Sequence, residues 1–277
     1  MRTALLQLCS SDDPAQNANT IVALMQQAKD GGAGFVCTPE VSNIISQDRA
    51  HQNAVLVTED TDQTLARLRD AAADLGLWLA IGSLAVKSGD PDGRFANRSF
   101  VINPNGDIVG RYDKIHMFDV QVTETETFQE SAGFRPGGEA VLVQTPFGTL
   151  GLTVCYDLRF PHLHRALAQA GADILLGPAA FSPVTGAAHW EPLLRARAIE
   201  TGCYMLAAAQ TGDHPIRSGK PRKTHGHSLA ISPWGEVIVD AGTDPDSIVF
   251  VDLDLQEVEK ARNRIPALKH DRPFTGP

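Results

Sequence analysis

Apolar and polar positions alternate along the chain between a helical and an extended pattern. At 14–30, apolar residues recur every three or four positions, Pro14 suits a first helical turn, and the pair Gly31-Gly32 ends the segment, as expected of an amphipathic helix. Short continuous apolar runs are typical of buried strands. Strands are expected at 3–9, 35–38, 77–84, 149–154, 173–176 and 204–208, and helices at 14–30, 65–75, 161–170 and 187–202. This alternation predicts an α/β protein.

Two segments share a longer pattern. Residues 99–109 and 228–238 both read Ser-x-x-Ile-x-Pro-x-Gly, followed by one acidic and two aliphatic residues. A proline followed two positions later by a glycine suits a turn between two strands. We expect two β-hairpins, either independent of each other or placed equivalently in two related halves of one structure.

The organisation of the chain favours one domain. No proline- or serine-rich linker and no block of like charges interrupts residues 1–277. The last segment, 263–277, contains several prolines and has no periodicity. It is expected to be an arm that packs on a partner subunit, or a loose end.

Charge and cysteine content narrow the classes of partner and compartment. The chain has 24 Lys and Arg against 33 Asp and Glu, a formal net charge of −9, without a long basic run, which argues against nucleic acid and anionic membranes as partners. It has no run of about 18 apolar residues and no pattern of a secretory signal. The four cysteines form no C-x-x-C pair, which argues against disulfides or zinc and favours a reducing compartment. A cytoplasmic protein is expected. The cysteines are Cys9, Cys37, Cys155 and Cys203.

Cys155 is the strongest single candidate for chemistry. It ends an apolar run and is followed six residues later by Pro161, which suits the start of a helix. A thiol at such a strand-to-helix turn is expected to lie near the positive end of a helix and to favour the thiolate. The backbone N–H after it can stabilise an oxyanion. The alternative is a small buried hydrophobic residue, which we favour for the other three cysteines.

Three charged residues are weaker candidates when each is taken alone. Glu40 follows an expected strand, at the end where α/β folds place ligands and catalytic groups. Lys114 follows the first hairpin, and its ammonium group could offset the charge of an oxyanion. Glu130 lies in a long loop, and such loops are often functional. For each residue the alternative is a solvated surface side chain.

Other known motifs are absent from the sequence. His225 and His227 could face the same side of a strand as two metal ligands would, but no further ligand follows at metal spacing, so no metal site is expected. Neither a complete nucleotide-binding glycine motif nor the G-x-S-x-G of serine hydrolases is present.

The candidates become one constellation when their order is considered. The chain resembles the nitrilase-like carbon–nitrogen hydrolase superfamily over about 3–273. Three segments carry the resemblance, in this order: Pro39-Glu40, Tyr112-Asp113-Lys114-Ile115-His116 and Cys155-Tyr156-Asp157-Leu158-Arg159-Phe160-Pro161. The resemblance implies a four-layer αββα sandwich and no metal or organic cofactor. It implies that Cys155 is the nucleophile, Glu40 the general base and Lys114 the oxyanion stabiliser, with Glu130 as a second glutamate. It also implies a homodimer or larger homo-oligomer.

Within the superfamily the chain is most similar to the Nit-type amidases. The segments that carry this similarity are 178–181, 185–191, 194–201, 207–214 and 226–228. They are closer to amidases of the deaminated-glutathione type than to omega-amidases. The pattern departs from the group in two ways: His225 stands where tyrosine is common, and 214–223 carries extra residues.

The resemblance implies hydrolysis of a small carboxylate-bearing primary amide to the acid and ammonia, through a thioester on Cys155. Tyr156, Arg159 and Phe181 are the expected substrate-binding residues, with Arg222 or Lys223 as other cations for the carboxylate. Arg195 and Arg197 are expected in structural ion pairs. The alternatives are an omega-amidase acting on 2-oxo diacid monoamides, an N-carbamoyl amine hydrolase, a less favoured nitrile hydrolase, and a non-catalytic scaffold protein.

Overall fold

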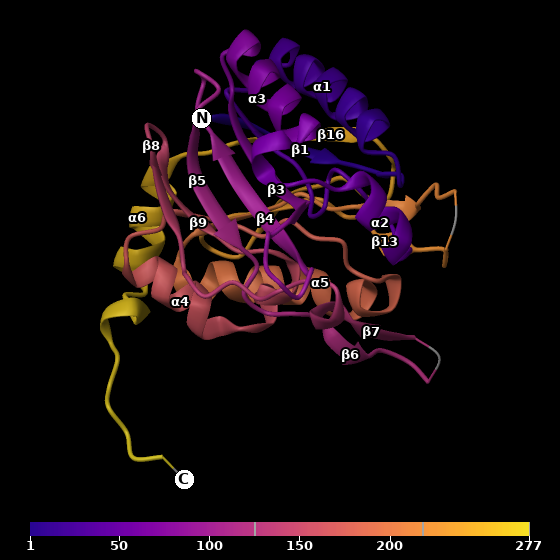
Figure 1. Cartoon of the computed structure of the whole chain (residues 1–277). Helices are drawn as coiled ribbons and strands as arrows, with labels where there is room; N and C mark the ends of the chain where they lie inside the picture. The colour runs from indigo at the N-terminus through magenta and orange to yellow at the C-terminus, as the bar shows by residue number, and fades with distance from the viewer. Residues whose placement is uncertain (125, 218, 277) are drawn as a thin grey trace.

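The computed structural model describes residues 1–124, 126–217 and 219–276, which form two facing six-stranded sheets with helices on their outer faces (Figure 1). The first sheet has the order β16-β1-β2-β3-β4-β5, and the second has the order β15-β14-β11-β10-β9-β8. The expected αββα sandwich is confirmed. Residue 218, in the expected 214–223 insertion, and residue 277, in the expected arm, lie outside the described residues. Residue 125 does so as well.

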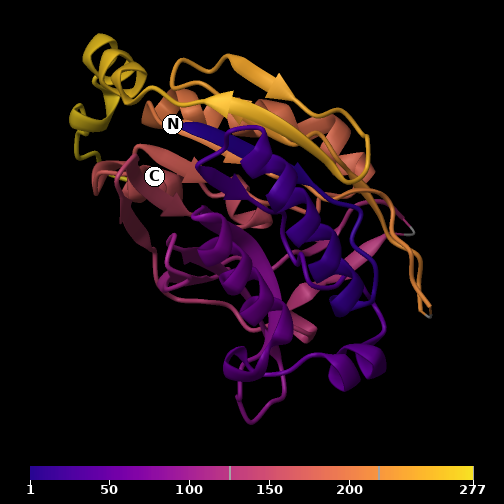
Figure 2. The ribbon, with the colours of Figure 1, turned by 90° about the horizontal axis from the view of Figure 1, so that it is seen from above.

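The first sheet is built mainly from the N-terminal half of the chain. Its strands are β1 (Arg2–Gln7), β2 (Phe35–Cys37), β3 (Trp78–Lys87), β4 (Phe95–Ile102), β5 (Ile108–Asp113) and β16 (Ser247–Asp252). Helices α1 (Pro14–Asp30) and α3 (Gln63–Leu75) cover its outer face (Figures 1 and 2). Asp13 caps α1 by accepting bonds from the N–H groups of Ala15 and Gln16, as an N-cap aspartate does.

The second sheet repeats this arrangement with the C-terminal half. Its strands are β8 (Leu142–Thr145), β9 (Gly148–Leu152), β10 (Ile174–Leu176), β11 (Tyr204–Ala207), β14 (Leu229–Ile231) and β15 (Val237–Asp240). Helices α4 (Pro161–Gln169) and α5 (Pro183–Thr201) lie on its outer face. Helix α5 begins four residues before the expected start, because Ser182 caps it and Pro183 occupies the first turn.

The two sheets share one pairing pattern. β1, β2 and β3 are parallel and are followed by the antiparallel strands β4 and β5; β9, β10 and β11 are parallel and are followed by β14 and β15. The two expected hairpins therefore occupy equivalent edges of the two sheets. This agrees with the interpretation that they belong to related halves.

Alternation along β1 shows how the layers are held together. Ala4 and Leu6 face α1 and α3, whereas Leu5 faces the second sheet, and all three are fully buried. Burying each such leucine side chain contributes about 1.5–3 kcal/mol. The layers therefore stabilise each other on both faces of the sheet.

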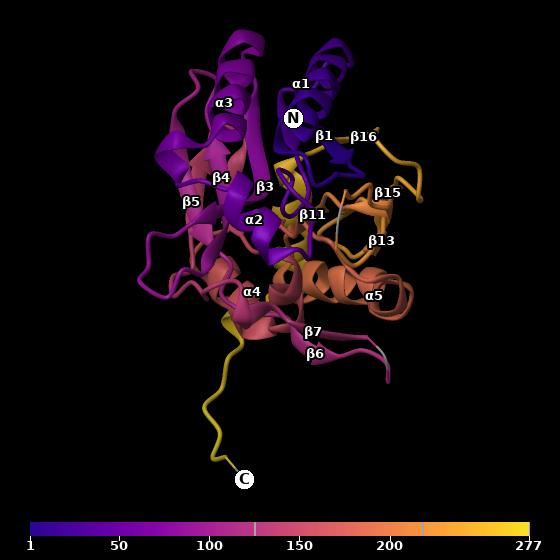
Figure 3. The same cartoon turned by 45° about the vertical axis from the view of Figure 1, so that its right-hand side comes forward.

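The remaining elements are short. They are α2 (Arg49–Val55), η1 (Glu59–Thr61), β6 (Asp119–Gln121), β7 (Thr127–Gln129), η2 (Glu130–Ala132), η3 (Cys155–Arg159), β12 (Thr211–Asp213), β13 (Lys223–His225), α6 (Leu255–Arg264) and η4 (Ala267–Lys269). Strands β6 and β7 form a hairpin that projects from the body on the side of α5 (Figure 3).

After α6 the chain continues as an arm that extends away from the two sheets and their helices (Figures 1 and 3). Its Asp271 pairs with Arg165 and Gln169 of α4, whereas Phe274 is 89% exposed. Among the helices of the described residues, none combines the length and the apolar character that a membrane crossing requires.

Candidate active site

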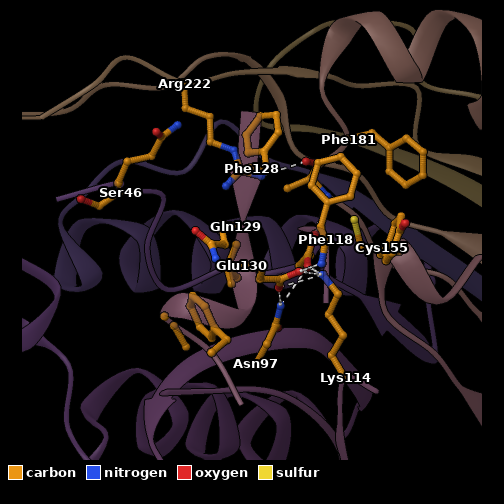
Figure 4. Close-up of a pocket in the computed structure, with 18 of the residues that line it drawn as sticks. Ser46, Asn97, Lys114, Phe118, Phe128, Gln129, Glu130, Cys155, Phe181 and Arg222 are labelled. Atoms are coloured by element: carbon orange, nitrogen blue, oxygen red, sulfur yellow. Dashed lines mark hydrogen bonds and ion pairs between the residues drawn. The ribbon is translucent and has the colours of Figure 1, made fainter. Parts of the chain in front are cut away.

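The three residues expected to form the triad follow three strands of the two sheets. Glu40 comes after β2, Lys114 after β5 and Cys155 after β9. Glu40 is hydrogen-bonded to both of the other residues, and Figure 4 shows the side chains of Lys114 and Cys155 at the same site. Gly82 allows this approach, since a Cβ there would lie 2.1 Å from the Thr38 carbonyl oxygen and 2.5 Å from the Pro178 Cβ. The loops of the two sheets can therefore touch where the site forms.

Lys114 is the centre of a buried ion cluster. Its Nζ donates to Glu40 Oε1 at 2.9 Å and to both carboxylate oxygens of Glu130 at 2.8 Å. The exposed fractions of the three side chains are 2%, 5% and 14% respectively. The second Glu40 oxygen accepts from the Ala180 N–H at 2.9 Å. Both carboxylates are thus held by directed donors, as buried charges require.

The ionisation of the cluster follows from these contacts. Burial by itself raises the pKa of Glu40, but the Lys114 charge and hydrogen bonds from Cys155 and Lys114 outweigh it, so the pKa lies below its usual value. Burial lowers the pKa of Lys114, and the charges of Glu130 and Glu40 outweigh this and raise the pKa well above its usual value. The resting site therefore holds an ionised Glu40 and a protonated Lys114.

The expectation of a resting thiolate at Cys155 is wrong. Burial raises the pKa of this thiol, and the adjacent Glu40 charge raises it further, to well above its usual value despite Lys114. The residue opens a five-residue 3₁₀ turn, not a long helix, so the positive end that it faces is weak. Cys155 is a neutral thiol hydrogen-bonded to an ionised carboxylate.

The backbone at Cys155 is strained. Its φ is +51°, in the left-handed region that a residue with a Cβ seldom adopts. Its N–H donates to the Pro178 carbonyl oxygen at 2.9 Å. Among the described residues, the Tyr156 N–H donates to no backbone group outside the turn. The turn therefore presents the thiol and an available N–H on the same short segment.

Asp157 ties this turn to the segment that carries Lys114. Its fully buried carboxylate accepts from the Val154 N–H at 2.8 Å and the Tyr112 hydroxyl at 2.6 Å. It also accepts from the N–H of His116 at 3.0 Å and lies 2.7 Å from the Nδ1 of that residue. One carboxylate thus joins the chain on both sides of Lys114 to the nucleophile turn. Sequence reasoning quoted Asp157 in a motif but gave it no role.

A cavity of about 250 Å³ opens beside the cluster, which suits a small molecule. Its apolar lining contains both aromatic and aliphatic side chains, and its polar lining includes amides, hydroxyls and one guanidinium (Figure 4). Beyond the cluster, lining residues include Phe118, Phe128, Phe134, Tyr156, Phe181, Ser46, Gln47, Gln52, Gln129, Thr185 and Arg222. Tyr156 and Phe181, two of the three expected substrate-binding residues, therefore line the cavity.

The cations expected near the substrate have different surroundings. Arg222 lines the cavity and donates to the Ala180 carbonyl oxygen at 3.0 Å. Arg159 is not among the lining residues; it lies over the Phe181 ring at 5.6 Å and contacts His189 Nδ1 at 3.3 Å. Lys223 is an exposed partner of Asp213.

Arg195 and Arg197 form the expected structural pairs. The first binds Glu191 and the Gly235 carbonyl oxygen, and the second binds Glu200 and the Leu158 carbonyl oxygen.

The weaker chemical candidates have structural surroundings. His225 and His227 stack at 4.6 Å, and His227 pairs with Asp240; within the described ranges, no three His, Cys, Asp or Glu residues are grouped to hold a metal. Burial raises the pKa of Cys37 and Cys203, and also raises that of Cys9, to about 11. These three thiols are neutral structural groups.

Asn97 is the residue of the cluster that sequence reasoning missed. It lies on β4, and its Nδ2 donates to Glu40 Oε1 at 2.9 Å and to Glu130 Oε1 at 3.4 Å. Its partners are 57 and 33 positions away in the chain, so no local pattern reveals the contact.

Comparison with known proteins places these features in a family. The carbon–nitrogen hydrolase family model matches residues 2–263. The deaminated glutathione amidase of Yersinia enterocolitica is 39% identical over 97% of this chain and 92% of its own length.

Two solved structures share the fold. The C. elegans NitFhit protein is 34% identical with a TM-score of 0.88, over 98% of this chain and 65% of that chain. The amidase from Nesterenkonia sp. AN1, a mutant of which carries acrylamide added at the active-site cysteine, is 26% identical with a TM-score of 0.76, over 96% and 98%. The chain therefore belongs to the carbon–nitrogen hydrolase family and is an amidase of the nitrilase superfamily.

Proposed function

We propose that the chain hydrolyses an amide of a small carboxylate-bearing acid, with deaminated glutathione as its substrate, through a thioester on Cys155. The observation that carries this proposal is the buried cluster of Glu40, Lys114 and Cys155, which opens onto a cavity that also holds the Arg222 guanidinium. The name of the Yersinia relative supports the choice of substrate.

Acylation begins with the neutral thiol. Glu40 takes the proton as Cys155 Sγ attacks the amide carbonyl carbon, and the oxyanion that forms is held by Lys114 Nζ and the Tyr156 N–H. Because the pKa of the thiol lies above that of the carboxylate, and each pKa unit of separation costs about 1.4 kcal/mol, proton transfer and attack proceed together. Protonated Glu40 then donates to the nitrogen, the C–N bond breaks and the amine leaves.

Deacylation uses the same groups in reverse. Water enters the vacated position, Glu40 takes its proton, and the hydroxyl oxygen attacks the thioester carbon. The collapse of the second oxyanion releases the acid, and the proton on Glu40 returns to Cys155 sulfur. Glu130, which binds Lys114 through both oxygens, orients the ammonium group throughout.

The choice of substrate changes the leaving group. Both amide bonds of glutathione are secondary, so a substrate derived from it releases an amine where a primary amide would release ammonia. Cleavage at the γ-amide of deaminated glutathione leaves a 2-oxoglutaryl thioester on the enzyme. The omega-amidase substrate 2-oxoglutaramate would give the same thioester, so only the leaving-group side of the cavity separates the two activities.

Arg222 is the group we assign to the substrate carboxylate. It lines the cavity and, within the described residues, pairs with a backbone carbonyl and no acidic side chain. Loss of a hydrogen bond to a charged group costs about 1.5–3 kcal/mol, so Arg222→Met is expected to reduce kcat/KM by about 10- to 100-fold for carboxylate-bearing amides only. Arg159→Met is the matched control, because Arg159 lies outside the lining. Equal losses for neutral amides would remove this assignment.

The test of the function is a substrate panel with wild-type protein and Cys155→Ala. The panel contains deaminated glutathione, 2-oxoglutaramate, an N-carbamoyl amine and a simple nitrile, with products identified by mass spectrometry. Release of cysteinylglycine, dependent on Cys155, supports the proposal. Faster turnover of 2-oxoglutaramate would make the protein an omega-amidase. No turnover, together with no acyl adduct on Cys155, would contradict the proposal and favour the scaffold alternative.

A further inference from the structure

Asn97 places one neutral amide between two carboxylates. Its Nδ2 donates to Glu40 Oε1 and Glu130 Oε1, the same two oxygens that accept from Lys114 Nζ. The residue is 2% exposed and lines the cavity. Figure 4 shows its side chain beside Lys114, with the amide directed at Glu130.

The orientation of this amide has a cost. With the Nδ2 group facing the carboxylates, the buried Oδ1 has no hydrogen-bond partner among the described residues. Buried polar atoms in native proteins are nearly always paired, and an exception calls for an explanation. Turning the amide over would place Oδ1 against carboxylate oxygens, which carry like charge. The carboxylates therefore determine the orientation, and pairing of Oδ1 is given up.

The charges around Glu40 explain the need for such a donor. The groups that face it are Lys114 from the end of β5, Glu130 from η2, Cys155 from η3 and Arg222 from the loop before β13. Among the described residues, Lys114 is the cation that hydrogen-bonds both carboxylates, and the Arg222 charge also lowers the pKa of Glu40 without a hydrogen bond to it. A second lysine would neutralise the site and weaken Glu40 as a base, whereas an amide donates to both carboxylates without adding charge.

We propose that Asn97 is a positioning residue that holds Glu40 and Glu130 together around Lys114 and keeps Glu40 ionised as the base for Cys155. This inference rests on the roles proposed above for Glu40 and Lys114. It assigns to β4 a part in catalysis that the Glu-Lys-Cys constellation does not contain. The consequence is that Asn97 sets the pH at which activity begins to fall on the acid side.

The test is the pH profile of kcat/KM for Asn97→Leu, which keeps the volume and removes the donor. Since Glu40 must be ionised, activity falls as pH decreases through its pKa. Loss of the donor raises that pKa, so the acid limb is expected to move to higher pH by about one pH unit, the size of effect that one hydrogen bond has on a carboxylate. Asn97→Ala serves as a second variant if leucine does not fold.

Asn17→Leu is the matched control. Asn17 is also buried, and within the described residues its side chain bonds to Ser11 and to the Asn43 carbonyl oxygen. Its replacement is expected to lower the unfolding midpoint without moving the acid limb. If Asn97→Leu behaves like this control, the positioning role is overturned while the proposed function stands.

A second readout does not depend on activity. Because the folded-state pKa of Glu40 lies below its unfolded value, the stability that Glu40 contributes is present above the unfolded pKa and is lost as pH falls through the folded pKa. The difference in unfolding free energy between wild type and Asn97→Leu is therefore expected to be largest near neutral pH and to shrink in acid. In a Glu40→Gln background this pH dependence should become smaller, because the Glu40 contribution is removed while the bond to Glu130 remains. A difference independent of pH in both backgrounds would refute the inference even if no substrate were turned over.

Discussion

At the scale of single residues, burial at Cys155 and the neighbouring Glu40 charge act in the same direction, and both favour the neutral thiol. In the proposed mechanism the nucleophile is therefore generated only when substrate is bound and Glu40 takes the proton. A free thiolate would react with oxidants and other electrophiles between turnovers, and the resting site avoids this.

This resting state predicts the ultraviolet spectrum. The difference between wild type and Cys155→Ala is expected to lack thiolate absorbance at neutral pH and to gain it only above the ordinary thiol pKa of 9.0. The measurement is a pH titration of that difference spectrum. A thiolate band at pH 7 would contradict the neutral resting thiol.

Lys114 predicts a joint loss of activity and stability. Lys114→Met removes an oxyanion donor, for which about a 10²- to 10³-fold loss of kcat is typical. It also leaves two buried carboxylates without their cation, and breaking a buried pair costs about 3–5 kcal/mol. Kinetics and chemical denaturation measure the two effects. Retained stability would mean that water or other donors replace Lys114 in the variant.

The residues that carry chemistry differ in how visible they are in the sequence. Glu40, Lys114 and Cys155 each follow a strand inside a short segment that could be read locally, and the order of the three segments identified the family. Asn97 and Asp157 act through partners that the fold brings from 33 to 57 positions away, so their roles depend on packing. The thiolate was predicted from a local turn, but burial and Glu40 determine its pKa.

At the scale of elements, the end of β5 and the turn η3 are joined by the Asp157 carboxylate. Lys114 lies between Tyr112 and His116, which both bind Asp157. The position of the ammonium group relative to Cys155 thus depends on a group that lines neither the cluster nor the cavity.

Asp157→Asn is expected to reduce kcat by about 10²-fold, the effect of a misplacement near 1 Å. Its partners are mainly donors, so the introduced NH₂ group would face another donor and the turn would shift. Asp113→Asn is the control, because Asp113 lies on β5 beside Tyr112 but pairs with Arg98 and Arg135. Comparable kcat losses in the two variants would indicate general destabilisation.

Short elements were the least predictable part of the fold. Strands β6 and β7 have three residues each, of which the first and third are exposed. Neither a helical nor an extended pattern of apolar residues can therefore be recognised in them. Helix α2 buries Gln52 as its only buried residue among those described, and it lacks an apolar face. β6 and β7 pair with each other, and residues of α2 and β7 line the cavity. These elements therefore depend on contacts that exist only in the assembled fold.

At the scale of the whole molecule, association stays a prediction. The exposed side chains of Ile199, Trp234 and Ile265 border a groove beside α6, and apolar side chains gathered in this way often mark interfaces. We expect light scattering to give at least twice the chain mass of 29.7 kDa. A mass equal to that of one chain at micromolar concentration would contradict the expected homo-oligomer.

The position of β16 has a consequence for synthesis of the chain. This strand pairs with β1 over Arg2–Gln7, and the N-terminal amine donates to the Leu253 carbonyl oxygen. On the ribosome the first sheet consequently remains incomplete until Ser247–Asp252 have emerged, and the edge of β1 stays open to wrong partners during that time. Although the two halves share one pairing pattern, the first sheet is therefore not complete without a strand that follows all the strands of the second sheet in the chain.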